Sequence, residues 1–304
     1  MPTRPMLAGT IEEAKHLSQL AWPMLASPKL DGIRCLIHPQ LGPVTRTFKP
    51  IPNRFIHNAL VSMGPELSYL DGELLTLRTD GSEEIFKDFN GIQSDVMSYG
   101  GAPEFQFHVF DDFTDINCPF NARILAARNR IRALRKHTDF IECVHHVEVI
   151  NQEEFLFIAS AHLDMGYEGT MLRSMDGPYK SGRSTFKQQW LLKWKPLEDA
   201  EAVIIGFEEL ERNVNEQTMS VLGLSKRSSH KAGKVKGGTL GKLLVRNCID
   251  NEEFAIGTGF DNALRDTIWK DQDTYMGLTV CYKYQKFGMK NKPRQPSFKG
   301  FRFD

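Results

Sequence analysis

Cysteine is scarce in this chain, and its spacing does not suggest a metal site. Only five cysteines occur among 304 residues, and no two of them form a CxxC pair. This pattern excludes a regular disulfide framework and disfavours a thiolate zinc site, so the sequence predicts a reducing compartment. The adjacent His145 and His146 have no partners at metal-ligand spacing, and a pair at a strand end explains them better.

Long apolar runs are also missing. No stretch approaches the roughly 20 residues that a membrane-spanning helix needs. The opening residues, MPTRPMLAGT, lack the apolar segment of a secretory signal. We therefore expect an intracellular, cytoplasmic protein without a membrane partner.

Neither sign of charge dominates, because 38 Lys and Arg stand against 38 Asp and Glu. The balance hides a local asymmetry: residues 225–302 contain 16 basic and 7 acidic side chains. Such a segment is typical of a surface that faces phosphates, and a solvated basic face is the alternative.

A Walker A phosphate loop is absent as well. The segment GGTLGKLL comes near the pattern, but only three residues separate Gly237 from Gly241. Leu243 also stands where Ser or Thr is required. A nucleoside triphosphate would have to be bound in another way.

The first two thirds of the chain mix strand and helix patterns. Strands are predicted at 33–37, 69–77, 105–113, 169–173 and 191–195. Helices are predicted at 10–20, 53–62, 83–97, 121–136 and 151–166, the first from a capping box that begins at Thr10. In the helix at 121–136, Arg128, Arg132 and Arg135 either meet DNA or form a solvated face.

Pro196 and the acidic residues after it mark a boundary, which predicts domains at 1–196 and 197–304. Beyond it, strands at 201–207, 241–246, 253–258 and 278–284 and one helix at 262–270 suit a small β-barrel of the OB type. The predicted fold class is therefore α+β.

A polar insertion at about 208–240 interrupts the barrel pattern. Its segment 211–241 has little periodicity, and loops of this length are usually functional or disordered. Cations spaced by Ser and Gly fit a strand that wraps a polyanion; they are Lys226, Arg227, Lys231, Lys234 and Lys236.

Lys29 lies in SPKLDGIRCL, residues 27–36, and three interpretations of it are open: a salt-bridged lysine, a surface lysine beside a turn, or a nucleophile. A nucleophilic lysine must lose its proton, which nearby cations and desolvation favour. Arg34, Lys193 and Lys195 could supply such cations. Asp31 could hold a metal or a ribose hydroxyl from the same side of an extended chain.

Two further carboxylates, Glu73 in YLDGELL and Glu168 in YEGTMLRS, lie in apolar company, which is costly unless they bind a cation or hydrogen-bond donors. Each alone is better explained as a turn or edge residue. Taken together, and in this order along the chain, Glu73 and Glu168 are not well explained as turn or edge residues.

The ordered motifs resemble the covalent nucleotidyltransferases. KxDGxR (residues 29–34) is followed by LDGEL, an aromatic strand that ends in FD, EGxMxR and LLKxK. Nearly the whole chain, including TRTFKPIPN and PRQPSFKGFR, is similar to the small ATP-dependent DNA ligases of viruses, phages and bacteria. That resemblance implies an adenylation domain of antiparallel sheets with flanking helices, followed by an OB-fold barrel.

The resemblance also implies roles for individual residues. Lys29 would carry AMP, and Lys193 and Lys195 would be the catalytic cations on its phosphate. ATP would be bound by Asp31, Arg34, Glu73, Phe110, Glu168, Lys193, Lys195, Arg294, Lys299 and Arg302. Magnesium, for which manganese should substitute, would be held by Asp31 and Glu168. For Phe110, the implied adenine-stacking ring, a plain core residue is the alternative.

Nicked duplex DNA is the implied partner. Its contacts would be Arg46, Lys49, Arg183, Lys226, Arg227, Lys231 and Lys234, the last four in a latch-like insertion. We expect a monomer that encircles DNA, without a separate N-terminal DNA-binding domain, zinc finger or BRCT domain. Thr45 replaces the serine of viral members and keeps the hydroxyl.

Three rival functions remain open. An RNA ligase or an mRNA-capping guanylyltransferase would use the same lysine chemistry. A non-catalytic OB protein with a decayed transferase domain is a different class, against which the complete set of acidic and basic motif residues speaks.

Overall fold

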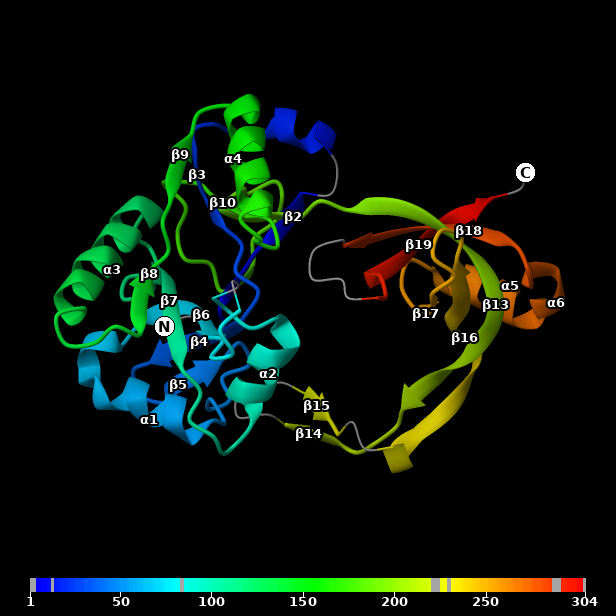
Figure 1. The fold of residues 1–304 in the computed structure, drawn as a ribbon, viewed down its shortest axis with the longest axis horizontal. Helices are drawn as coiled ribbons and strands as arrows, with labels where there is room; N and C mark the ends of the chain where they lie inside the picture. The colour runs from blue at the N-terminus through cyan, green and yellow to red at the C-terminus, as the bar shows by residue number, and fades with distance from the viewer. Residues whose placement is uncertain are drawn as a thin grey trace. The chain divides into compact units, whose positions relative to one another are not determined.

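Two units make up the chain, Met1–Lys195 and Pro196–Asp304 (Figure 1). The computed structural model describes residues 4–11, 14–82, 85–219, 225–228, 231–285 and 291–302. We call the two parts the N-terminal unit and the C-terminal unit, and each is described by itself.

Two five-stranded sheets form the frame of the N-terminal unit. The first has the order β2 (Gly9–Ile11), β12 (Leu191–Trp194), β10 (Thr170–Arg173), β3 (Met24–Pro28) and β9 (Val147–Val149). The second has the order β5 (Gly42–Thr45), β4 (Ile33–His38), β6 (Leu70–Thr76), β7 (Phe105–Asp112) and β8 (Ile141–Cys143). A short parallel pair joins β1 (Met6–Leu7) to β11 (Gly182–Arg183).

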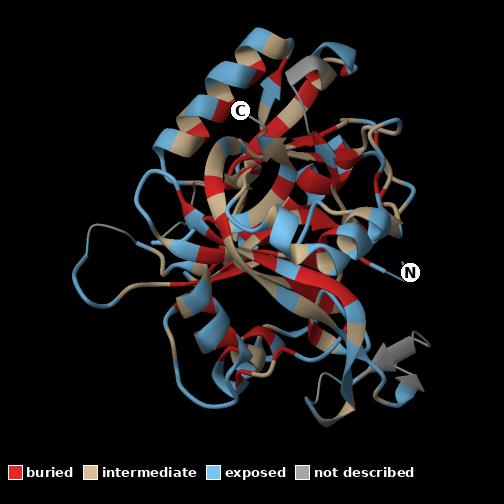
Figure 2. Cartoon of the chain, turned by 90° about the vertical axis from the view of Figure 1, so that its right-hand side faces the viewer, coloured by how far each residue is buried: buried red, intermediate tan, exposed pale blue. Residues whose placement is uncertain are grey.

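Helices cover these sheets and close two apolar cores. They are α1 (Arg54–Ser62), α2 (Phe89–Met97), α3 (Phe120–Leu134) and α4 (Gln152–Asp164), with 3-10 turns at Ala14–Gln19 and Gly64–Leu67. Leu60, Val96 and Ile124 pack with the second sheet in one core, and Phe155 packs with the first sheet in the other. Figure 2 shows the buried positions on the sheets and the exposed outer faces of the helices.

The C-terminal unit is built on one five-stranded sheet. Its order is β17 (Glu253–Ile256), β16 (Lys234–Asn247), β13 (Glu198–Asn213), β18 (Thr279–Gln285) and β19 (Arg294–Arg302). A parallel bridge between Thr258 and Ser297 connects the two edges, as in a partly open barrel. The helix α5 (Asn262–Lys270) buries Ile268 in the barrel core, and α6 (Gln272–Tyr275) follows it.

The polar insertion is largely a hairpin, which corrects the expectation of an irregular loop. Strands β13 and β16 stay paired out to Asn213 and Lys234, and β14 (Gln217–Met219) pairs with β15 (Ser225–Arg227). A 3-10 turn at Lys231–Gly233 precedes β16. Glutamates of β13 form ion pairs with lysines of β16 along the two long strands. Such cross-strand pairs of opposite charge support strand pairing in a polar sequence.

The predicted α+β class is confirmed, and most predicted elements are found within a few residues. The helix predicted at 10–20 has the wrong start, because Thr10 lies in β2 and pairs with Lys193 of β12; a 3-10 helix spans Ala14–Gln19 instead. The helix predicted at 83–97 begins only at Phe89, since Phe86 pairs with Leu77 and Asp88 caps the helix. Residues 12–13 and 83–84 lie outside the described residues.

Among the helices that the structure describes, none combines the length and the apolar character needed to cross a membrane.

Candidate active site

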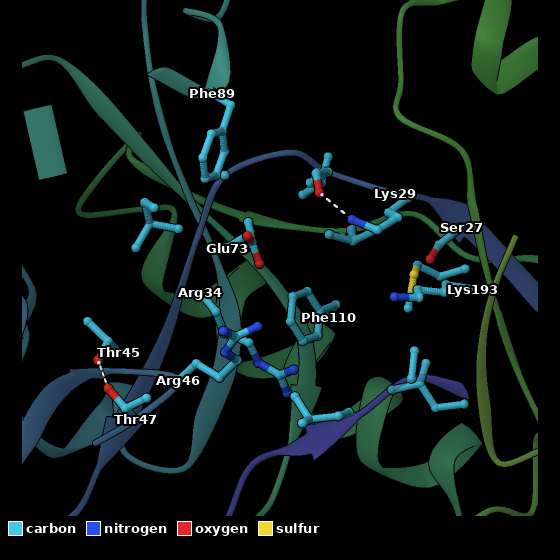
Figure 3. Close-up of a pocket in the computed structure, with 18 of the residues that line it drawn as sticks. Ser27, Lys29, Arg34, Thr45, Arg46, Thr47, Glu73, Phe89, Phe110 and Lys193 are labelled. Carbon is cyan, nitrogen blue, oxygen red and sulfur yellow. Dashed lines mark hydrogen bonds between the residues drawn. The ribbon is translucent and has the colours of Figure 1, made fainter. Parts of the chain in front are cut away.

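The N-terminal unit contains a cavity of about 620 Å³. It is lined from both sheets, and Figure 3 shows its central side chains. Of the predicted site residues, it collects Lys29, Arg34, Arg46, Lys49, Glu73, Phe110, Arg183 and Lys193. Side chains that lie far apart in the sequence therefore meet around one space.

Lys29 lies at the crossing between the two sheets. It directly follows β3 of the first sheet, and β4 of the second sheet begins four residues later. Its backbone N–H donates to Gly169 O at 2.9 Å, and Glu168 N donates to Lys29 O at 3.3 Å. Gly32 is required in this crossing, since a Cβ there would lie 2.3 Å from Leu74 O.

The ammonium of Lys29 forms an ion pair with Glu168, and it also lies 3.4 Å from Leu30 O. The other carboxylate oxygen of Glu168 pairs with Lys195. Glu168 is buried, with a side chain that is 2% exposed, whereas that of Lys29 is 20% exposed and reaches the cavity. Glu168 thus holds two lysines that follow different strands of the first sheet, Lys29 after β3 and Lys195 after β12.

A group of cations gathers on one side of the cavity. Burial lowers the pKa of Lys193, and the charges of Lys29, Arg183 and Arg46 lower it further. Arg183 also donates to Ala8 O at 2.6 Å, which fixes its guanidinium at the rim. Like charges held this close favour the binding of an anion among them.

Phe110 lines the cavity, and two arginines lie over its ring. The guanidinium of Arg34 lies 5.1 Å from the ring centroid, and that of Arg173 lies 5.8 Å from it. Buried aspartates hold both arginines: Asp71 accepts from Arg34 Nε at 2.8 Å, and Asp111 accepts from Arg173 at 2.6 Å. An apolar ring fixed in this way offers a flat surface for a planar group.

The donors of Arg34 already have partners inside the protein. Besides Asp71, Met6 O accepts from Arg34 at 2.7 Å, and Tyr179 donates to the same aspartate at 2.6 Å. Burial acts to lower the pKa of Arg34, but the charge of Asp71 and its hydrogen bond raise it overall. Arg34 is therefore a permanently charged element of the cavity wall.

Glu73 faces the same cavity from β6 (Figure 3). Burial raises its pKa to about 7 despite the opposing charges of Lys29 and Arg34, and the charges of Asp71 and Asp31 add to the rise. Asp31 itself does not line the cavity. Among the described residues, no group of three or more His, Cys, Asp or Glu side chains is placed to hold a metal ion.

Sequence reasoning missed several residues of this site. Arg173 closes the EGxMxR pattern and Asp71 belongs to LDGEL, but neither was assigned a role. Met171 and Phe89 also line the cavity. The signal for Arg173 and Asp71 was present, since both are charged residues in apolar strands that require buried partners.

The remaining predicted residues lie in the C-terminal unit. On β19, Lys299 pairs with Asp199, and Arg302 lies 3.0 Å from Glu201; Arg294 begins the same strand. On the hairpin, Lys234 lies 3.1 Å from Glu211, and Lys231 is exposed. Lys226 and Arg227 lie in β15, where only the backbone is described.

Comparisons with known proteins agree with this geometry. Residues 5–195 match the family model of the ATP dependent DNA ligase domain, and residues 232–302 match that of the DNA ligase OB-like domain. The chain belongs to the ATP-dependent DNA ligases. The predicted family, and the adenylation and OB-type folds that it implies, are thereby confirmed.

Individual relatives point the same way. The crystal structure of Chlorella virus DNA ligase–adenylate is 32% identical, covers 99% of this chain and 100% of its own, and superposes with a TM-score of 0.55. An African swine fever virus DNA ligase is 30% identical over 141 residues, which are 46% of this chain and 32% of that protein. A probable DNA ligase of Streptomyces coelicolor is 28% identical over 227 residues, which are 68% and 42% of the two chains. The chain thus spans less than half the length of these two curated relatives.

Proposed function

We propose that this protein is an ATP-dependent DNA ligase that seals nicks between a 3′-hydroxyl and a 5′-phosphate in duplex DNA. One observation carries the proposal: a buried carboxylate holds Lys29 at the wall of a cavity that combines a cation group with a fixed aromatic ring. This arrangement suits the phosphates and the base of one nucleotide at the same time.

In the first step, Lys29 Nζ attacks the α-phosphorus of ATP and pyrophosphate leaves, which forms a phosphoramidate to AMP. Glu168 pairs with Nζ and is the group placed to accept its proton as the N–P bond forms. Lys193, Arg46 and Arg183, whose charges act on one another, would neutralise the charge that develops on the phosphates. Catalysis of this kind depends on positioning and charge neutralisation.

The base and the sugar of the nucleotide have their own contacts. We infer that adenine stacks on Phe110, against which the guanidinium groups of Arg34 and Arg173 also lie. Glu73, whose pKa burial raises to about 7, would accept hydrogen bonds from the ribose hydroxyls in its ionised form. Asp31, whose charge acts on Glu73, would support the same end of the nucleotide.

Magnesium belongs to this chemistry as a neutraliser of the ATP phosphates. It commonly uses only one or two protein carboxylates together with phosphates and waters. Glu168 and Asp31 would supply those two carboxylates, although Glu168 also pairs with Lys29 and Lys195. Manganese should replace magnesium there.

In the later steps, AMP passes from Lys29 to the 5′-phosphate of the nick, and the 3′-hydroxyl then displaces AMP and closes the backbone. Arg46, Lys49 and Arg183 are the proposed contacts to the nick from the N-terminal unit. In the C-terminal domain, Arg294, Lys299 and Arg302 would orient ATP for the first step. The hairpin would hold the duplex, and we expect a monomer to encircle it.

Two measurements test the proposal. The protein is incubated with α-phosphate-labelled ATP or GTP and magnesium and then denatured, and sealing is scored on matched nicked DNA and RNA duplexes. We expect covalent label from ATP and sealing of nicked DNA. Absence of covalent label would sink the enzyme proposal and favour a non-catalytic binding protein, label from GTP alone would favour an mRNA-capping enzyme, and sealing of RNA alone would favour an RNA ligase.

A further inference from the structure

A second, smaller cavity lies in the N-terminal unit, on the face that α3 and β8 share. Its volume is about 260 Å³. Arginines at positions 128, 132 and 135 of one helical stripe line it, together with Glu142, Cys143 and His145. The nucleotidyl-transfer steps described above use none of these side chains.

The charge of this cavity is unbalanced. Arg135 donates to Glu142 at 2.9 Å, and Glu142 is the only carboxylate among the lining residues. Arg132 has no ion-pair or hydrogen-bond partner among the described residues. Two guanidinium charges therefore remain without a lining carboxylate, one from Arg128 and one from Arg132.

The helix geometry places the three arginines on the same face of α3. Residues four and three positions apart on a helix share one face, at spacings of about 6 and about 4.5 Å along the axis. A guanidinium offers a planar fork of donors that matches a phosphate group. A cavity lined by the guanidinium groups of α3 and by His145 can surround a phosphate group. A helix face that is only solvated would not require such a cavity.

The smaller cavity shares a lining residue with the larger cavity. Val144 lines both the cavity of the arginine stripe and the cavity that holds Phe110, so the two cavities share a wall residue.

We propose that the cavity beneath α3 is a phosphate-binding site, with Arg128 and Arg132 as its main donors. The phosphate could belong to a nucleic-acid backbone or to a free anion such as pyrophosphate, and the experiment separates the two sources. The proposal does not depend on the ligase chemistry of Lys29.

Two cysteines of the chain provide the measurement. Cys143 is half-buried in the cavity wall and Cys248 is exposed in the C-terminal unit; both thiols are free. The full-length protein is alkylated with N-ethylmaleimide, and the rates at both sites are followed by peptide mass spectrometry. The probes are inorganic pyrophosphate and an intact DNA duplex without a nick, each titrated separately.

We expect a bound phosphate to slow labelling of Cys143 and to leave Cys248 unchanged. Arg132→Gln should raise the probe concentration needed for half-protection by about tenfold, the effect of one charge-assisted hydrogen bond. Lys136→Gln is the matched control, because Lys136 is an exposed cation next to the same helix end but outside the cavity. Arg132 does not line the nucleotide cavity, so binding there would be insensitive to Arg132→Gln.

Protection by both probes supports a general phosphate site, and protection by the duplex alone assigns the site to a nucleic-acid backbone. Protection by pyrophosphate alone assigns it to a free anion. Protection that is equal in wild type and Arg132→Gln, or the absence of protection by either probe, overturns the proposal and leaves the stripe as a solvated face. Lys29→Ala should keep the protection while it loses covalent AMP, which separates this test from that of the ligase proposal.

Discussion

Cations gather in both the nucleotide cavity of the N-terminal unit and the hairpin of the C-terminal unit, but they meet different surroundings. In the cavity, burial lowers the pKa of Lys193, and the charges of Lys29, Arg183 and Arg46 lower it further. On the hairpin, glutamates of β13 face the lysines: Lys236 lies 3.5 Å from Glu209, and Lys242 lies 2.8 Å from Glu208.

The difference teaches what each region can do with a phosphate. A half-buried group of like charges gains much from one anion, because the anion relieves both their repulsion and their desolvation. An exposed and charge-balanced hairpin gains little from one contact, since each phosphate competes with a glutamate and with salt. The first arrangement suits chemistry at a single point, and the second suits adjustable contact along a polyanion.

Replacement of the central lysine should have the largest effect. Lys29→Arg keeps a positive charge that can pair with Glu168, but a guanidinium does not give up its proton. We expect covalent AMP formation to fall more than about a thousandfold, as for other lost nucleophiles. A gel assay with α-labelled ATP measures it. Label retained in Lys29→Arg would show that the lysine has only a structural role.

Removal of one cavity cation should come next. Lys193→Gln takes away a positive charge beside the phosphates, and we expect self-adenylation to slow by about a hundredfold. Lys270→Gln, an exposed lysine in the last turn of α5, is the control that loses the same charge elsewhere. Equal rates for the two variants in rapid-quench measurements would contradict the assigned cation group.

Deletion of the hairpin should separate DNA binding from nucleotide chemistry. Replacing residues 213–236 by a short glycine turn removes the proposed backbone contacts and leaves the first cavity intact. We expect nick affinity to weaken by about tenfold at moderate salt, with a smaller salt slope, while self-adenylation changes much less. Fluorescence anisotropy on nicked duplex tests this, and an unchanged affinity would refute the latch role.

The smallest expected effect has the opposite sign. Glu209→Gln with Glu211→Gln frees Lys236 and Lys234 from their partners, while a glutamine oxygen can still accept from Gly238 N. Nick binding should tighten by about two- to fivefold, in line with the small energy of exposed pairs. Glu253→Gln, which breaks the 2.7 Å pair with Arg246, is the matched control. Equal affinities would mean that the glutamates do not compete with DNA.

The sequence pointed to side chains of the cavity more readily than to the residues that support them. Motif order singled out Lys29, Glu73, Phe110 and Lys193, and all four line the same cavity, while their roles stay predictions. The buried supports of Phe110 could not be assigned. The ion pairs of Asp71 with Arg34 and of Asp111 with Arg173 join strands that are distant in sequence.

Secondary structure failed where tertiary contacts override local signals. Thr10 carries a helix-capping pattern but is held in β2 by its pairing with β12. The polar insertion has little apolar periodicity, yet it forms strands, because cross-strand ion pairs replace apolar contacts. In contrast, the helix predicted at 262–270 has the right bounds, and in the structure Asp261 caps it by accepting from Leu264 N.

A pulse–chase experiment tests the central claim most directly. The protein is charged with α-labelled ATP, freed of nucleotide and mixed with nicked duplex DNA and magnesium in the absence of ATP. The account predicts that label maps to Lys29, leaves the protein as AMP, and is matched by about one sealed nick per charged molecule. Label that maps to another residue, or that stays on the protein while nicks remain open, would contradict it.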